Sequence, residues 1–157
     1  MLTSARSFAT EEGKPVMLLQ LLLAACLIAV TVAIQAAFMS VGLGALKSME
    51  ESGHAMTTRR PNLVVVLWIV FLLIPIAIDV VLWACLYRLR NALPNFEDAL
   101  YFSIVTFTTV GYGDIVLDRG SRLLATFEAV NGWIIFGWAT ALVMVVIQRL
   151  YLPGLPR

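Results

Sequence analysis

Residues 108–114 read Thr-Thr-Val-Gly-Tyr-Gly-Asp, residue types that could bind a dehydrated cation through backbone carbonyl oxygens. Successive carbonyls point to one side only if residues alternate in handedness, which is cheap for glycine at positive φ and costly for others. Gly111 and Gly113 are two residues apart and supply that alternation. One strip of carbonyls cannot surround an ion, so a ring requires several copies of the chain about an axis. We expect four copies.

The segments that must position this loop are strongly apolar. The chain of 157 residues is 61% hydrophobic and 13% charged, with a net charge of +1, unlike a soluble globular protein. Residues 16–46 contain no charged side chain, 63–87 contain only Asp79, and 123–147, within the segment 122–148, contain only Glu128. Because about 20 apolar residues cross a bilayer, the sequence predicts three transmembrane helices over these ranges.

Residues 93–120 are too broken to cross the membrane and too apolar for an ordinary surface loop. Asn95 can cap a helix over 95–107, whose first turn is acidic. At 1.5 Å a residue this helix is roughly half a bilayer long, so it must enter the membrane and return. Irregular backbone at that depth is tolerated where it lines a water-filled path. We predict an all-α membrane protein, one domain over 1–157, with three spans, a re-entrant pore helix and a filter loop.

The potassium channel family has a signature that residues 109–113 resemble, Thr-Val-Gly-Tyr-Gly. Three spans in about 150 residues are also similar to a group of short bacterial ion-channel proteins. The resemblance implies that potassium ions bind the carbonyls of Thr109, Val110, Gly111 and Tyr112, together with the Thr109 hydroxyl. It implies that the filter is supported by Thr108, Gly113, Asp114 and the pore-helix residues Tyr101, Phe102 and Val105, with the Tyr112 phenol packed against pore-helix aromatics.

The resemblance further implies a potassium-selective channel that conducts passively through a homotetrameric pore in a bilayer. We expect it in a plasma membrane of bacterial type, with the N-terminus outside and the C-terminus cytoplasmic. No enzyme activity and no cofactor other than permeant potassium are expected. No nucleic-acid partner is expected either, because the basic residues form no cluster. The gating stimulus and any additional subunit are left unassigned.

Two positions depart from the best-known small bacterial channels. Val105 stands where that pattern has a glutamate that shares a proton with the residue matching Asp114, so inactivation through such a pair is not expected here. Residues 115–122 also lack the proline that commonly follows the filter, which predicts a differently shaped outer loop.

The predicted inner helix contains two features with alternative interpretations. Gly132 lies where the resembling helices have a glycine hinge, but small residues in membrane helices also allow close packing, here beneath the pore helix. Phe136, Thr140 and Met144 recur at four-residue spacing. By resemblance they line the inner cavity, and the alternative is a contact between subunits.

Two acidic residues lie inside predicted spans, where a charge costs about 2.5–3.5 kcal/mol at the bilayer centre. Asp79 follows Pro75 by one turn, and either a structural hydrogen bond to a partner such as Asn131 or Arg90 or a role in gating or proton sensing would explain it. Glu128 precedes Gly132 by one turn and is expected to pack behind the filter or extend a polar network around it, with no partner identified.

Three other functions are compatible with parts of this pattern. A potassium transporter subunit would typically contain four pore-loop repeats, whereas this sequence contains one. A weakly selective cation pore is the second alternative, but Tyr112 is the residue expected to complete the outer ion sites. A membrane enzyme or a non-conducting assembly protein is the third alternative, and no metalloprotease or nucleophile motif favours catalysis.

Overall fold

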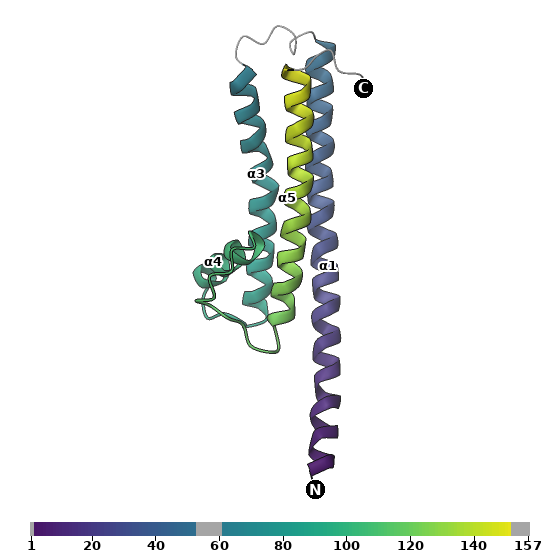
Figure 1. Ribbon diagram of the computed structural model, residues 1–157, viewed down its shortest axis with the longest axis vertical. Helices are drawn as coiled ribbons and strands as arrows, with labels where there is room; N and C mark the ends of the chain where they lie inside the picture. Colours follow the sequence, from purple (N-terminus) through teal and green to yellow (C-terminus); the bar gives the residue numbers. More distant parts are fainter. Residues whose placement is uncertain (1, 53–60, 152–157) are drawn as a thin grey trace. The chain divides into compact units, whose positions relative to one another are not determined.

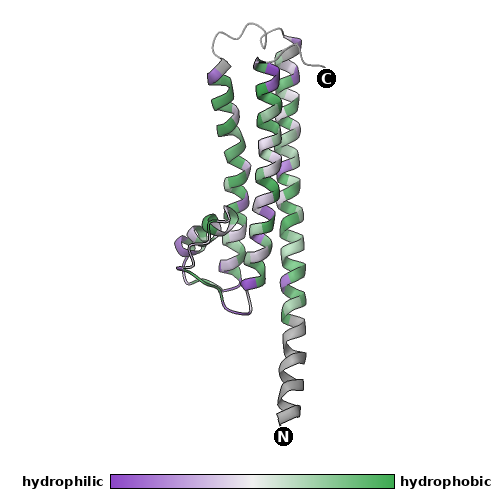
Figure 2. Cartoon of the chain, viewed as in Figure 1, coloured by the Kyte–Doolittle hydropathy of each residue, from purple (hydrophilic) through white to green (hydrophobic). Residues whose placement is uncertain are grey.

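The computed structural model describes residues 2–52 and 61–151, which form helices joined by loops, without a strand in these ranges. The helices are α1 (Leu2–Glu51), α3 (Pro61–Leu89), α4 (Phe96–Phe107) and α5 (Arg122–Tyr151) (Figure 1). Three of them are long and apolar enough to cross a membrane, over Val16–Met49, Asn62–Leu89 and Arg122–Tyr151, and Figure 2 shows the apolar residues that dominate them. The predicted fold class of three apolar spans and one short intervening helix is confirmed.

The described residues pack as two compact units. The first contains residues of Met1–Val30 and Val80–Trp133, and the second contains residues of Thr31–Asp79 and Ile134–Arg157. The loop at 108–114 and the whole of α4 therefore belong to the first unit.

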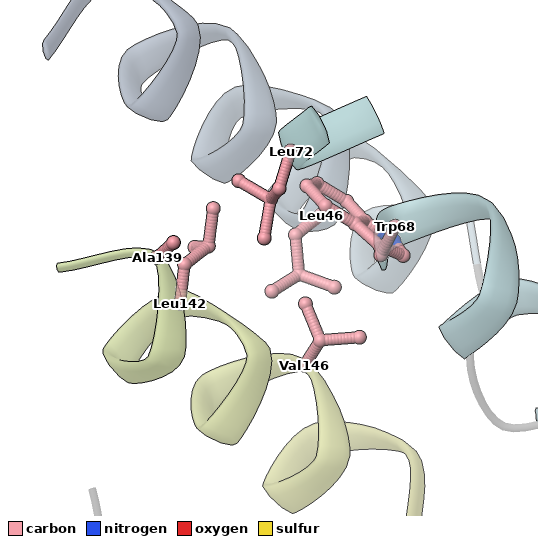
Figure 3. Packing of buried hydrophobic residues seen from close by; sticks show 6 residues of the cluster. All are labelled: Leu46, Trp68, Leu72, Ala139, Leu142 and Val146. Carbon is pink, nitrogen blue, oxygen red and sulfur yellow. The ribbon is translucent and has the colours of Figure 1, made fainter. Parts of the chain in front are cut away.

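The second unit is held by apolar side chains from three helices. Its core consists of Leu46 of α1, Trp68 and Leu72 of α3, and Ala139, Leu142 and Val146 of α5 (Figure 3). Trp68 also meets Phe71 edge-on, with ring centroids 5.7 Å apart. Since lipid tails are as apolar as these side chains, close packing rather than the hydrophobic effect must stabilise the contact.

Gly42 of α1 provides a test of that packing. A Cβ at Gly42 would lie 2.8 Å from Cζ3 of Trp68 and 3.4 Å from Cε1 of Phe71, and the rigid indole must then shift. We expect Gly42→Ala to destabilise the protein by about 1–3 kcal/mol, as measured by thermal unfolding in detergent. Gly44→Ala is the matched control, because a Cβ there meets nothing within 4 Å. A cost for Gly44→Ala equal to that for Gly42→Ala would contradict this explanation.

In the first unit, α4 begins where Asn95 caps it. The Asn95 side chain accepts a hydrogen bond from the Asp98 backbone N–H (2.7 Å), and its amide donates to the Asp98 carboxylate (2.8 Å). Phe102 of α4 packs edge-on against Tyr87 of α3 at a centroid distance of 5.2 Å. Gln20 of α1 joins the same unit, since its side-chain oxygen accepts from the backbone N–H of Leu123 (3.2 Å). The short helix is thus fixed at its start and along its buried face.

Candidate ion-binding loop

The backbone of the loop after α4 alternates in handedness. φ is positive at Thr109 (61°), Gly111 (56°) and Gly113 (78°), and not at Val110 or Tyr112 between them. The two glycines predicted this alternation, but Thr109 was not predicted to take part. A β-branched residue with positive φ is strained, and such strain of about 1–3 kcal/mol concentrates at functional sites. Extending the two-residue spacing of the glycines back by one step would have identified it.

The start of the loop is bonded to the end of α4. The carbonyl oxygen of Val105 accepts from the N–H groups of Val110 (3.0 Å) and Gly111 (3.2 Å). The Thr108 hydroxyl donates to the carbonyl oxygen of Ile104 (2.7 Å). These bonds satisfy carbonyls that the helix end would otherwise leave free, so any displacement of α4 moves the loop with it. Val105 thus supports the loop through its backbone.

The loop side chains make few contacts within their own chain. Val110 is 52% exposed and Tyr112 is 72% exposed. Among the described residues Tyr112 makes no ring contact, whereas Phe102 packs on Tyr87 and the Tyr101 hydroxyl bonds Asp114. Packing of Tyr112 on pore-helix aromatics stays a prediction.

Asp114, at the end of the loop, is bonded to α4. The Tyr101 hydroxyl donates to Oδ2 of Asp114 (2.7 Å), and the Ile115 backbone N–H donates to Oδ1 (3.1 Å). The bond from Tyr101 lowers the pKa of the Asp114 carboxyl, and the same bond raises the pKa of Tyr101. In this chain Val105 stands where the small bacterial channels have a glutamate, and the neutral hydroxyl of Tyr101 is the side chain that donates to Asp114.

Replacing Tyr101 by phenylalanine tests this bond. The ionised Asp114 accepts the bond, so its stabilisation is present above the usual aspartate pKa and is lost as pH falls through the lowered pKa. We expect Tyr101→Phe to move the protonation midpoint of Asp114 to a higher pH, measured by NMR of carboxyl-labelled aspartate. Asp114→Asn identifies the signal. An unchanged midpoint would show that the hydroxyl does not stabilise the carboxylate.

Glu128 of α5 is fully buried beside two hydroxyl groups. The Tyr87 hydroxyl lies 2.5 Å from Oε2 of Glu128, and the Ser103 hydroxyl lies 2.5 Å from Oε1. Ser103 Oγ is also 2.9 Å from the carbonyl oxygen of Val80. Sequence reasoning assigned no partner to Glu128 and missed both hydroxyls. Ser103 was the available signal. Residues four apart share a helix face, so this polar residue lies on the same face of α4 as the apolar Phe107 and, being buried there, needs a hydrogen-bond partner.

Gly132 lies where α5 approaches the end of α4 most closely. A Cβ at Gly132 would overlap the Phe107 carbonyl oxygen and lie 2.9 Å from its carbon, with Cδ1 of the Phe107 ring at 3.1 Å. The helix α5 continues without interruption through this position. The packing alternative therefore describes a contact that the structure contains, while a hinge at Gly132 stays a prediction.

Asp79 differs from what the sequence suggested. Its side chain is fully buried, yet neither carboxylate oxygen has a hydrogen-bond partner within residues 2–52 and 61–151. The expected bond to Asn131 or Arg90 is therefore wrong for the described chain, and Arg90 instead donates to the carbonyl oxygen of Gly120 (3.4 Å). Trp83, one turn further along α3, likewise has a buried side-chain nitrogen without a hydrogen-bond partner in these ranges.

The three residues proposed for the inner cavity lie in the second unit. The Thr140 hydroxyl donates to the carbonyl oxygen of Phe136 (2.8 Å), a bond within α5. Thr140 and Met144 are exposed, and Phe136 is half-buried. An exposed face of this kind suits a cavity or a subunit contact equally, so both interpretations stay open.

Comparisons with known proteins identify relatives of the segment that contains α3, α4, the loop and α5. A family described as "Ion channel" matches residues 63–149, more than half of the chain. Two-pore potassium channel 1 of Arabidopsis thaliana is 44% identical over 59 residues, 34% of this chain and 16% of that protein. Two-pore potassium channel 4 of the same plant is 51% identical over 41 residues, 26% of this chain and 14% of that protein.

The matched segments are thus less than a fifth of the length of either plant relative. No solved structure matches the chain. The family match covers α4, the loop at 108–114 and most of the two spans that flank them. The chain therefore belongs to the ion channel family.

Proposed function

We propose that this chain is one subunit of a potassium-selective channel that conducts potassium passively down its electrochemical gradient. The observation that carries the proposal is the alternating backbone at Thr109, Gly111 and Gly113. Such a backbone directs successive carbonyl oxygens to one side, and rings of carbonyls replace the hydration shell of a potassium ion. The names of the two plant relatives, both potassium channels, support the choice of ion.

Four copies are proposed to form the pore, because one loop provides only one strip of carbonyls. The ion would be bound by the carbonyl oxygens of Thr109, Val110, Gly111 and Tyr112 and by the Thr109 hydroxyl. Two observations support assembly. Val110 and Tyr112 are exposed in the single chain, and a Cβ at Gly111 or Gly113 would meet nothing of the same chain within 4 Å.

The proposed orientation follows from the same loop. With Thr109 toward the cytoplasmic cavity and Tyr112 toward the outside, α3 runs from the cytoplasm outward and α5 runs back. The N-terminus would then be outside and the C-terminus in the cytoplasm of a cell with a bacterial-type plasma membrane. Cysteine accessibility at each end of α3 in intact cells tests this orientation independently of conduction.

Ion flux tests the proposed function directly. Purified full-length protein in liposomes should pass potassium far faster than sodium, and crosslinking should give a tetramer. Equal passage of both ions would indicate the weakly selective pore, and slow saturable uptake would indicate the transporter subunit. No flux across a range of pH, voltage and membrane tension would favour the non-conducting assembly protein. Protein-free liposomes and liposomes with a Gly111→Ala variant are the controls.

A further inference from the structure

Four oxygen-bearing groups form a continuous chain of short contacts inside the first unit. The chain begins at the Tyr87 hydroxyl, passes through both carboxyl oxygens of Glu128 and the Ser103 hydroxyl, and ends at the carbonyl oxygen of Val80. The three oxygen–oxygen distances are 2.5, 2.5 and 2.9 Å. Tyr87, Ser103 and Glu128 are each completely buried, so water cannot complete an unmade bond from outside.

Counting hydrogens shows which state of Glu128 satisfies all three contacts. Tyrosine and serine hydroxyls carry one hydrogen each, and a backbone carbonyl carries none. If Glu128 were ionised, the single hydrogen of Ser103 would have to serve both the carboxylate and the Val80 carbonyl. With a proton on Oε1 of Glu128, each contact contains one hydrogen: Tyr87 donates to Glu128, Glu128 donates to Ser103, and Ser103 donates to Val80.

We propose that Glu128 is held as a neutral carboxylic acid whose proton completes this chain, and that the chain positions the pore helix and, through it, the ion-binding loop. A neutral acid also avoids the cost of a charge within a membrane span. The positional part of the inference rests on the proposed channel function, whereas the proton on Glu128 does not.

The connections made by the chain explain why the loop depends on it. Tyr87 and Val80 are on α3, Glu128 is on α5 and Ser103 is on α4, so one acid links three helices. One turn beyond Glu128, α5 touches the backbone of Phe107 at Gly132. The helix α4 is thus held at two successive turns, next to the Val105 carbonyl that binds the loop amides. Glu128 touches no ion and acts as a positioning residue.

Infrared spectroscopy tests the proton. Wild-type protein in liposomes at neutral pH should show the carbonyl stretch of a protonated carboxyl group, and Glu128→Gln should remove it. Asp79→Asn separates any contribution of the other buried acid, whose oxygens have no partner among the described residues. A wild-type spectrum without this band, or an Asp79→Asn spectrum whose band is unchanged when Glu128→Gln is added, would overturn the neutral-acid assignment.

Two substitutions at position 128 test the positional role. A glutamine has one acceptor and one donor group, the pattern of a neutral acid, so Glu128→Gln should keep the potassium-to-sodium permeability ratio within about twofold of wild type. Glu128→Leu removes both the acceptor and the donor at position 128 and leaves the Tyr87 and Ser103 hydroxyls without this partner. This variant should lower the permeability ratio by about tenfold, as expected when buried hydrogen bonds are lost. A ratio that falls equally in both variants would show that the charge of Glu128 matters and would overturn the proposal.

Ser103→Ala is a second test of the positional role, to be used if the Glu128→Leu protein does not fold. It should lower the permeability ratio with an intact oligomer, whereas Ser40→Ala should not, because the Ser40 hydroxyl bonds only within α1 (2.9 Å). A wild-type ratio in Ser103→Ala would contradict the positional role. If wild-type protein fails to distinguish potassium from sodium, the proposed function and the positional role fail together, and the infrared band still decides the state of Glu128.

Discussion

Gly111→Ala should abolish selective potassium flux while the protein still reaches the membrane. The position has φ of +56°, where a side chain with a Cβ costs about 1–2 kcal/mol. Four copies in the proposed pore would multiply that cost to about 4–8 kcal/mol. Apart from the two neighbouring residues, no atom of the same chain lies within 4 Å of the added Cβ, so within one chain it is backbone strain and not crowding that opposes the alanine. The measurement is potassium and sodium flux in liposomes.

Gly120→Ala is the matched control for this substitution. Gly120 is also in the loop region of the first unit, a Cβ there meets nothing within 4 Å, and its φ is not positive. Flux through Gly120→Ala should equal that of wild type. Wild-type flux through Gly111→Ala would mean that the alternating backbone is dispensable, and the proposed ion-binding role of the loop would then be wrong.

Gly132→Ala should be the most destabilising single methyl added to the inner helix. Here strain is absent and space is lacking, because the Cβ overlaps the Phe107 carbonyl. Backbone atoms cannot rotate away as a flexible side chain can, so α4 and α5 must separate. Overpacked cores lose about 1–3 kcal/mol of unfolding free energy, and we expect a loss near the upper end of that range. The gain of about 1 kcal/mol in helix propensity from glycine to alanine offsets part of it.

Thermal unfolding in detergent measures this loss, and Gly137→Ala on the same helix is the control. A Cβ at Gly137 meets nothing within 4 Å, so that variant should be as stable as wild type or slightly more stable. Potassium flux through Gly132→Ala should also fall, because the end of α4 holds the loop. A Gly132→Ala protein as stable as Gly137→Ala would show that the two helices separate without cost.

The elements of this fold were predictable because their signals are local. Spans follow from apolar runs, and the start of α4 follows from Asn95 with the acids after it. Alternation in the loop was predictable at the glycines, where the residue type itself permits positive φ. Thr109 was missed because a threonine by itself does not signal positive φ, and the only signal in the sequence was its two-residue spacing from Gly111.

The partners of Glu128 could not be predicted for a different reason. Glu128 is 25 residues from Ser103 and 41 residues from Tyr87, and the contact of the three side chains depends on how three helices are rotated about their axes. Nearly continuous apolar spans contain little periodicity from which that rotation could be inferred. The same limit applies to Asp79, where a polar partner was expected because a charge is costly inside a membrane span, and the described residues provide none.

The strain at Thr109 has a thermodynamic consequence for the proposed assembly. In a single chain, backbone bonds to the end of α4 accompany a β-branched residue at φ of 61°, while the side chains of Val110 and Tyr112 stay exposed. In the proposed tetramer the four loops would support one another, and folding of the loop would then be linked to association by mass action. If the loops support one another in this way, dilution of the protein with lipid should cost the proposed ion-binding loop its order before the helices that flank it.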